Sequence, residues 1–252
     1  MKMKAMYSVA LLVAMTVLLV ISVTVHASKM DDRIESSAKK SYVFKTYLNN
    51  DDIKIRSKNG VVSLTGSVSE ESHKSLAKET VAGVPGVKSV DNRLEVKGER
   101  SAEMSDAWLT AKVKTTLLFH RKVRTLTEVI TKDGIVTLQG NAASQAQKDL
   151  TTEYAKDVEG VKDVNNEMSV KEGLKKAGSV GEKIDDASIT ALVKMTLLYH
   201  RSTSAIDTKV TTKNGVVTLS GKAKNETEKD QATKLVADVH GVKNVKNRMT
   251  IE

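Results

Sequence analysis

Two residue pairs have the types that acid–base or metal chemistry uses: His120-Arg121 and His200-Arg201, each at the end of a matching apolar segment. A histidine in such a site needs a carboxylate or a second histidine at ligand spacing, and none recurs beside either pair. A histidine near a helix C-terminus interacts favourably with the helix dipole, so a structural role is the better interpretation. The absence of cysteine excludes thiol catalysis and zinc–thiolate sites. The sequence therefore predicts no catalytic residue, no metal and no cofactor.

Three glycine-containing stretches have the spacing of a phosphate-binding loop: NGVVSLTG, DGIVTLQG and NGVVTLSG. A phosphate loop needs its glycines between a strand and a helix, so that backbone N–H groups point at the anion. Here Asn-Gly or Asp-Gly separates two β-rich runs, which predicts a type I′ hairpin turn with positive φ. The second glycine is expected to end the second strand, and a later glycine to cap a helix. We interpret all nine as structural turn residues: Gly60, Gly134, Gly215, Gly66, Gly140, Gly221, Gly86, Gly160 and Gly241.

These stretches belong to one unit that is written three times. In the second copy, Leu109, Val113 and Leu117 follow one face of a helix that begins behind Ser105-Asp106. Asn225 with Glu228 resembles a capping box at the start of a second helix in the third copy, and Ser144 with Gln147 repeats it in the second. A third strand follows, predicted over residues 242–251 in the third copy. The unit reads α-β-β-α-β.

An asparagine recurs in the third strand of every copy, at Asn92, Asn166 and Asn247. An asparagine in this setting more often ties down a bulge or a neighbouring turn than binds a ligand. We therefore interpret the three asparagines as structural residues and not as ligand-binding residues.

The sequence thus predicts an α+β protein of three tandem domains at 28–98, 105–171 and 184–252, each a three-stranded sheet with two helices on one face. The segments GERSAEMS and EGLKKAGSVGEK are polar and contain glycine, as linkers do. A single core is not expected. Since each unit is small, its core is marginal, and contact between units would add stability.

The first residues have the layout of a secretory signal peptide. Lys2 and Lys4 precede an uncharged run from Ala5 to Val25, and small residues occupy the minus-three and minus-one positions before a cleavage site after Ala27. The run is long enough for a retained membrane anchor, which is the alternative. We expect residues 1–27 to be removed and the remainder to lie in the periplasm. The chain stays net positive without the two leader lysines, and in an exported protein this favours anionic lipid headgroups over nucleic acid.

The first helix of the second copy carries a second apolar surface. Trp108 and Phe119 fall away from the core-facing stripe, and no acidic residue occurs from Ala107 to Thr127. The first and third copies carry Arg33 and Ser188 at the position of Trp108, so core packing does not demand an aromatic and the position is expected to be exposed. Tryptophan and leucine beside cations are typical of a surface that lies in a lipid interface. The predicted lipid-binding residues are Trp108, Lys112, Lys114, Leu118, Phe119, Arg121 and Lys122.

A competing interpretation is that this face docks on a neighbouring repeat or a partner. The third copy has a comparable second stripe in Leu192, Met195, Leu198 and Tyr199. The sequence leaves this alternative open.

The motifs ITALVKMTLL and V-x-x-x-N-G-V-V-T-L-S-G, with the finish A-x-x-V-x-G-V-x-x-V-x-N, resemble the BON domain. The resemblance covers all three copies and is weakest in the first helix of the first. The whole chain resembles the periplasmic osmotically inducible proteins built from tandem BON domains. That likeness implies an α-β-β-α-β fold, an envelope location, no catalysis, and binding of phospholipid or stabilisation of the envelope under osmotic stress. Without cysteine, the chain cannot be a lipoprotein as some relatives are.

The function we expect is therefore non-enzymatic binding of anionic phospholipid surfaces. The alternative is a periplasmic polypeptide-binding or chaperone-like module that uses the same apolar face for exported polypeptides. The two differ in salt dependence, because headgroup binding weakens as salt screens charge. The sequence leaves the oligomeric state open.

Overall fold

The computed structural model describes residues 29–97, 105–123, 127–171, 183–203 and 208–252. The expected leader and, apart from Ser105 and Lys183, both expected linkers lie outside the described residues.

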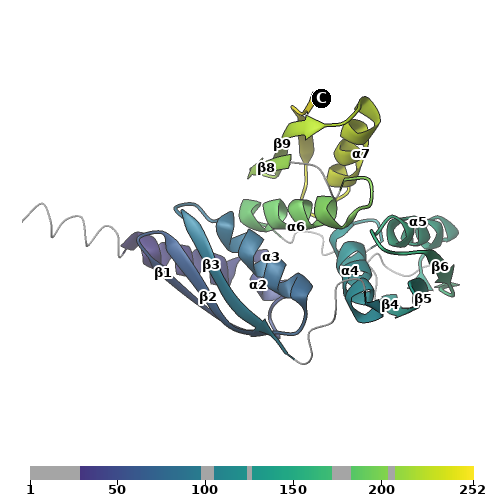
Figure 1. Ribbon diagram of the computed structural model, residues 1–252, viewed down its shortest axis with the longest axis horizontal. Coiled ribbons are helices and arrows are strands. Elements are labelled where there is room, and N and C mark those ends of the chain that lie inside the picture. The colour runs from purple at the N-terminus through teal and green to yellow at the C-terminus, as the bar shows by residue number, and fades with distance from the viewer. Residues whose placement is uncertain (1–28, 98–104, 124–126, 172–182, 204–207) are drawn as a thin grey trace, which may run out of the picture.

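Each repeat folds as a helix, a hairpin, a second helix and a returning strand, which confirms the predicted α+β fold (Figure 1). Repeat 1 contains helical residues 29–40, α2 (Tyr42–Thr46), β1 (Asp52–Lys58), β2 (Val61–Val68), α3 (Glu71–Ala82) and β3 (Ser89–Val96). Repeat 2 contains α4 (Asp106–Phe119), β4 (Thr127–Lys132), β5 (Ile135–Ala142), α5 (Gln145–Lys156), β6 (Asp163–Asn166) and β7 (Ser169–Val170). Repeat 3 contains α6 (Asp186–Tyr199), β8 (Thr208–Lys213), β9 (Val216–Ala223), α7 (Glu226–Ala237), β10 (Asn244–Asn247) and β11 (Thr250–Ile251).

The second strand of each repeat is the centre of its sheet. In repeat 1 it pairs antiparallel with β1 across the hairpin and parallel with β3, which returns after α3. A parallel neighbour needs such a crossover helix. In repeats 2 and 3 the third strand is divided into two short pieces that both pair with the central strand. The prediction of one continuous strand over 242–251 is therefore wrong, because the strand is interrupted between Asn247 and Thr250.

The recurring asparagine explains how the third strand is held. Asn247 accepts from the Met249 N–H at 2.9 Å and donates to the carbonyl of Lys229 in α7 at 2.9 Å. Asn92 and Asn166 make the same pair of bonds within their own repeats. Each asparagine thus ties its strand to the second helix, and its role is structural.

An aspartate at the start of the first helix holds the hairpin turn of every repeat. The Asp186 carboxylate accepts from the N–H groups of Asn214 at 2.7 Å and Gly215 at 2.8 Å. Asp31 and Asp106 grip their own turns in the same way. The clamp joins residues about 28 positions apart in the chain, and it was not anticipated from the sequence.

The glycines take the positive φ that their positions need. Gly60, Gly134 and Gly215 have φ near +80° in the hairpin turns. Gly66, Gly140 and Gly221 do not end the second strand as expected, because each strand continues for two more residues. A Cβ on Gly66 would lie 2.0 Å from the Asp52 carbonyl oxygen, so the close pairing of the hairpin excludes a side chain there. The expected C-cap glycines are also misplaced: the second helices are capped three residues earlier, by Gly83, Asp157 and Asp238.

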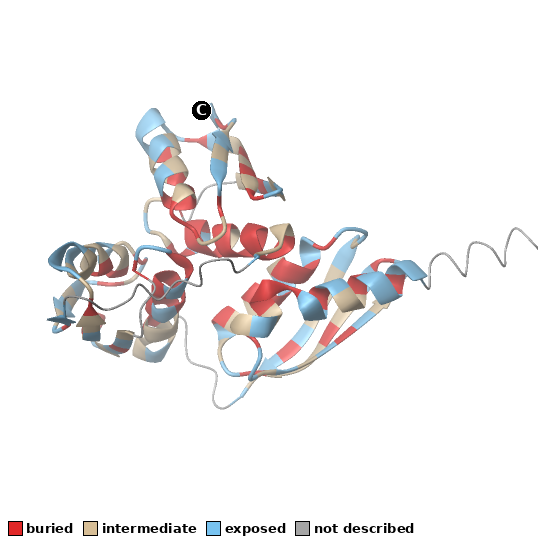
Figure 2. Ribbon diagram, turned by 180° about the vertical axis from the view of Figure 1, so that it is seen from behind, coloured by how far each residue is buried: buried red, intermediate tan, exposed pale blue. Residues whose placement is uncertain are grey.

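The three repeats meet at α6, which packs against α3 of repeat 1 and α4 of repeat 2 (Figure 1). Eleven of its fourteen residues are buried, including Leu192 and Met195, so most of the α6 surface is covered and Leu198 stays exposed (Figure 2). A helix buried on more than one face needs apolar residues beyond a single stripe, and Ala191, Leu192 and Met195 supply them. Repeats 1 and 3 share one hydrophobic cluster, whereas repeat 2 keeps its own. Contact between repeats is therefore part of the core.

We expect Gly215→Val to destabilise repeat 3 by at least about 1–2 kcal/mol, because a β-branched residue is disfavoured at φ +79°. Its Cβ would also lie 3.2 Å from the Gly241 carbonyl oxygen. Thermal unfolding measures the loss. Asn214→Gly, in the same turn, is the control and should retain native stability; native stability of Gly215→Val would contradict the turn assignment.

Candidate functional site

The predicted lipid-binding residues of α4 divide between the surface and an interface. Lys114, Leu118, Arg121 and Lys122 are exposed, and Trp108 is half-buried. Lys112 and Phe119 are only 3% and 1% exposed. The expectation that these two lie on the outer surface is wrong, because the repeats close over them.

Phe119 lies at the junction of all three repeats. Its ring meets the Tyr47 ring of repeat 1 edge to face, with centroids 5.4 Å apart. Tyr47 in turn contacts Tyr42, and Tyr42 contacts the His240 ring of repeat 3 at 5.7 Å. Edge-to-face aromatic pairs of this kind stabilise by about 0.5–1.5 kcal/mol beyond their buried area. The aromatic at the end of α4 is therefore a docking residue.

Lys112 fills a gap between Trp108 of its own helix and Tyr199 of repeat 3. Its Nζ lies 4.1 Å from the Trp108 ring centroid and 5.2 Å from that of Tyr199. It donates to the Glu159 carbonyl oxygen at 3.2 Å and lies 3.8 Å from the Glu159 carboxylate. Burial lowers the pKa of the Lys112 ammonium, and Glu159 opposes that effect. The ammonium is thus held internally by two rings and one acidic residue.

Trp108, Lys112 and Tyr199 line part of a cleft of about 510 Å³ between the repeats. Repeat 1 lines another part, where Glu70, Glu71 and Ser72 lie at the α3 N-terminus. Burial raises the pKa of the Tyr199 hydroxyl, and the negative charges of Glu70 and Glu71 raise it further. The structure therefore places Trp108 at the mouth of an inter-repeat cleft rather than on an open helix face.

Repeats 2 and 3 dock on each other reciprocally. The end of α4 pairs with the end of α7, through the Arg121 N–H and the Asp238 carbonyl at 3.1 Å. The end of α6 pairs with the end of α5 in the same way, through the Arg201 N–H and the Asp157 carbonyl at 2.9 Å. A second backbone bond accompanies each: His240 N–H to Phe119 carbonyl, and Glu159 N–H to Tyr199 carbonyl, both 2.9 Å. Repeat 2 thus gives repeat 3 the same contacts that repeat 3 gives repeat 2, as the two subunits do in a two-fold symmetric interface.

The His-Arg pairs supply the side chains of this interface. The His120 ring lies 3.4 Å from the Asp238 carboxylate, and the His200 ring lies 3.5 Å from that of Asp157. Arg121 donates to the Ala237 carbonyl at 2.6 Å. Arg201 likewise donates to the carbonyls of Val161 at 3.0 Å and Lys156. The interpretation of the histidines as structural stands, but they bridge two repeats instead of only ending their own helices.

Asp238 is the most heavily contacted carboxylate of the interface. Tyr154 donates to it at 2.5 Å, with its ring stacked on His120 at 3.9 Å. Arg121 and Lys122 lie 3.5 and 3.3 Å from its other oxygen. Burial raises the pKa of Asp238, but His120 and Tyr154 outweigh it and hold the pKa below its usual value. Two of the predicted lipid-binding cations are thus partly neutralised by an acidic residue far away in sequence.

Repeat 1 docks differently because of one residue. It has Gly83 where repeats 2 and 3 have Asp157 and Asp238. A Cβ on Gly83 would lie 3.1 Å from the Ala187 Cα, so glycine allows α3 to approach the start of α6. The sequence does contain a signal for the interface between repeats 2 and 3. Only these two repeats have both the His-Arg pair after the first helix and an aspartate at the end of the second helix.

A family model for the BON domain matches residues 30–98, 105–172 and 185–252. The chain belongs to the BON domain family. It is similar to the osmotically-inducible protein Y of Escherichia coli, with 38% identity over 57% of this chain and 71% of the relative. It is also similar to the outer membrane lipoprotein DolP of Haemophilus influenzae and a 21 kDa hemolysin of Actinobacillus pleuropneumoniae, at 38% and 37% identity. The matches to these two cover 42% of this chain and 56% of each relative.

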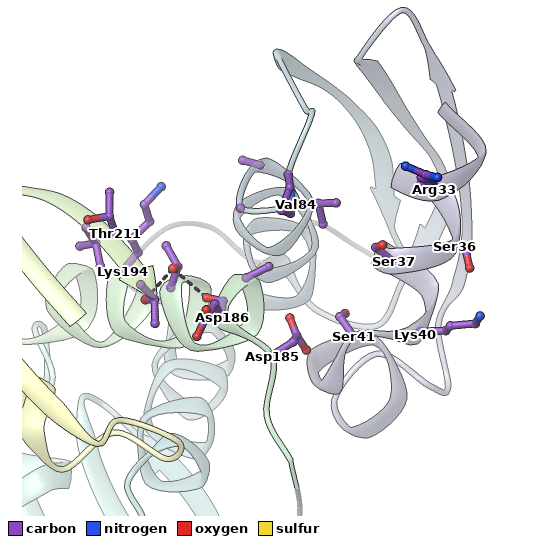
Figure 3. A pocket seen from close by; sticks show the side chains of 17 residues that line it. Arg33, Ser36, Ser37, Lys40, Ser41, Val84, Asp185, Asp186, Lys194 and Thr211 are labelled. Carbon is purple, nitrogen blue, oxygen red and sulfur yellow. Dashed lines mark hydrogen bonds between the residues drawn. The ribbon is translucent and has the colours of Figure 1, made fainter. Parts of the chain in front are cut away.

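A second cleft, of about 790 Å³, lies between BON repeats 1 and 3 (Figure 3). Its carboxylates are engaged by the fold: Asp186 holds the hairpin turn, and Asp185 accepts from Ser188 and from the Tyr42 N–H at 2.7 Å. Lys194 pairs with Glu79 of repeat 1 at 2.7 Å. The cleft thus offers no free acid–base pair. Within the described ranges no group of histidine and acidic residues could hold a metal ion, and no helix there is long and apolar enough to cross a membrane.

We expect Asp238→Asn to destabilise the protein at neutral pH by about 1–3 kcal/mol, because it removes charge-assisted contacts from a buried carboxylate. Since the folded pKa of Asp238 is lowered, its contribution is present above the usual value of about 3.8 and is lost as pH falls through the folded pKa. The deficit of the variant should therefore shrink below about pH 3.8. Denaturant unfolding at pH 7 and pH 3 measures it.

Asp163→Asn is the control, because its carboxylate is 70% exposed. It should change stability little at either pH. A deficit of Asp238→Asn that is absent at pH 7, or unchanged at pH 3, would contradict the interface electrostatics.

Proposed function

We propose that this BON protein is a non-enzymatic envelope protein that binds anionic phospholipid surfaces during osmotic or envelope stress. The names of its relatives, an osmotically-inducible protein and an outer membrane lipoprotein, support this setting. The leader-like start of the sequence supports export to the periplasm. The carboxylates of the two clefts all have partners within the fold: Asp185, Asp186 and Glu70 accept hydrogen bonds, and Glu71 lies 3.9 Å from Lys74. This favours binding over catalysis.

The observation that carries the proposal is an apolar and basic stripe that stays exposed on α4. Ala107, Lys114 and Leu118 share one side of the helix and are exposed, with Leu118 38% exposed. Lys114 forms no ion pair within the described residues, unlike Lys112 and Arg121. An exposed leucine beside an unpaired cation suits the boundary between lipid headgroups and acyl chains.

The equivalent stripe of repeat 3 lacks the free cation. Leu198 corresponds to Leu118 and is 50% exposed, but Lys194, which corresponds to Lys114, is paired with Glu79. Lipid binding is therefore assigned to repeat 2. The chain supplies its own control, an exposed leucine of the same helix position without the neighbouring free charge.

Lys114→Glu with Leu118→Glu should weaken flotation with anionic vesicles by about ten-fold or more, because each cation near an anionic surface contributes about 1 kcal/mol. Leu198→Glu should leave flotation close to that of the unmodified protein. Binding of the unmodified protein should fall with salt and be absent with neutral vesicles. Equal losses in both variants, or binding to neutral vesicles, would contradict the assignment to α4.

A second function, capture of exported polypeptides, is favoured by the cleft between repeats 1 and 2. Trp108 and Tyr199 give it aromatic walls, and Glu70 and Glu71 give it a polar rim. Aromatic side chains with a polar handle are common anchors in binding sites. This function would show as salt-insensitive binding of an unfolded apolar polypeptide that Trp108→Ala abolishes and Lys114→Glu leaves unchanged.

A further inference from the structure

On the open face of the repeat 3 sheet, every charged residue of the strands is a cation. The buried residues Val210, Val217 and Leu219 face the helices, so the residues that alternate with them face outward. Five outward and exposed positions carry a cation: Lys209, Lys213, Lys222, Lys246 and Arg248. None of the five forms an ion pair within the described part of the chain. The four described strands of repeat 3 contain no acidic residue, and Glu252 follows directly after β11.

The pairing register arranges these cations in two rows. On one side β8 places Lys209 opposite Ser220 and Lys213 opposite Val216 of the central strand. On the other side β10 places Lys246 opposite Thr218. Neighbouring strands are about 4.8 Å apart, so the rows run about 10 Å from each other. Between them β9 carries the shorter outward side chains of Val216, Thr218 and Ser220, followed by the fifth cation, Lys222.

The same face of the other repeats has a different charge. Repeat 2 has Glu128 at the position of Lys209 and Glu167 at that of Arg248. Repeat 1 has Asp91 at the position of Lys246, and this carboxylate pairs with Arg93 at 2.6 Å. Repeat 1 keeps cations at Lys54, Lys58 and Arg93, but Asp52, Asp91 and Glu95 lie on the same face. Only in repeat 3 do the described strands present cations on this face with no acidic residue among them.

We propose that this face binds a linear anionic polysaccharide that lies along β9. Carboxylates or phosphates of such a chain would meet cations from both rows. Its hydroxyls would meet those of Thr218 and Ser220 between the rows and of Thr211 on β8. The surface differs from the α4 stripe in repeat, element and chemistry, so it extends the proposed function instead of restating it.

Two other polyanions fit the face less well. Proteins that bind single-stranded nucleic acid stack its bases on aromatic side chains, and residues 208–252 contain no Trp, Tyr or Phe. A surface that lies in a membrane carries large apolar anchors beside its cations, whereas the outward residues of β9 are Thr218, Ser220, Lys222 and one partly buried valine, Val216. An anionic polysaccharide can bind to a surface that has neither aromatic side chains for base stacking nor apolar side chains that enter a membrane.

The test measures binding of the full chain to polygalacturonate by calorimetry at low and moderate salt, with dextran as the neutral probe. In the first variant, Lys209→Gln, Lys213→Gln and Arg248→Gln are combined. The matched control removes the cations at the equivalent positions of repeat 1, with Lys54→Gln, Lys58→Gln and Arg93→Gln. Both variants lose the same charge, so a general effect of net charge is separated from a local one.

We expect the repeat 3 variant to weaken polygalacturonate binding about ten-fold or more, and the control to change it less than about two-fold. Lys222→Gln with Lys246→Gln, a second variant of the same face, should also weaken it. All the altered side chains are exposed, so melting temperatures should stay near that of the unmodified protein.

The proposal is overturned if polygalacturonate does not bind, or if both triple variants lose binding equally. It is also overturned if the repeat 3 variant retains polygalacturonate binding and loses binding to single-stranded DNA or to anionic vesicles instead. Flotation by the α4 stripe should be unchanged in the repeat 3 variant, so failure of this proposal and failure of lipid binding give different results.

Discussion

The structure depends on the burial of two opposite faces of α6. One face of this helix closes the core of its own repeat, and the other packs on α3 of repeat 1 and against α4. Exposing that second face would leave Leu192, Met195 and Tyr199 in water, so the three repeats are held together by the same hydrophobic effect that folds each of them. The reciprocal His-Arg and Asp contacts then fix how repeats 2 and 3 meet.

This packing decides which surfaces remain for partners. It removes Phe119 and Lys112 from solvent, and it neutralises part of the charge on Arg121 through Asp238. What stays free is the Lys114–Leu118 stripe of α4 and the basic sheet face of repeat 3. The proposed division of labour follows: repeat 1 would brace the assembly, whereas repeats 2 and 3 would each present a different surface to anionic partners.

Local features of the fold could be predicted from the sequence because they depend on neighbours in the chain. The Asn-Gly turns, the capping boxes at Ser144 and Asn225, and the α-β-β-α-β order are of this kind. The Asp186 clamp and the interruption of the third strand were missed, since both depend on residues brought together only by folding. The surface of α4 was misjudged for a related reason: an apolar, cationic helix face has the same composition whether it meets lipid or a neighbouring repeat.

The three BON repeats form one cooperative body through α6. Differential scanning calorimetry of the full chain checks this by comparing the calorimetric and van't Hoff enthalpies of unfolding. We expect a single transition in which the two enthalpies agree, because repeats 1 and 3 share one core and repeat 2 is tied to both. Separate transitions for individual repeats, with a calorimetric enthalpy well above the van't Hoff value, would contradict it.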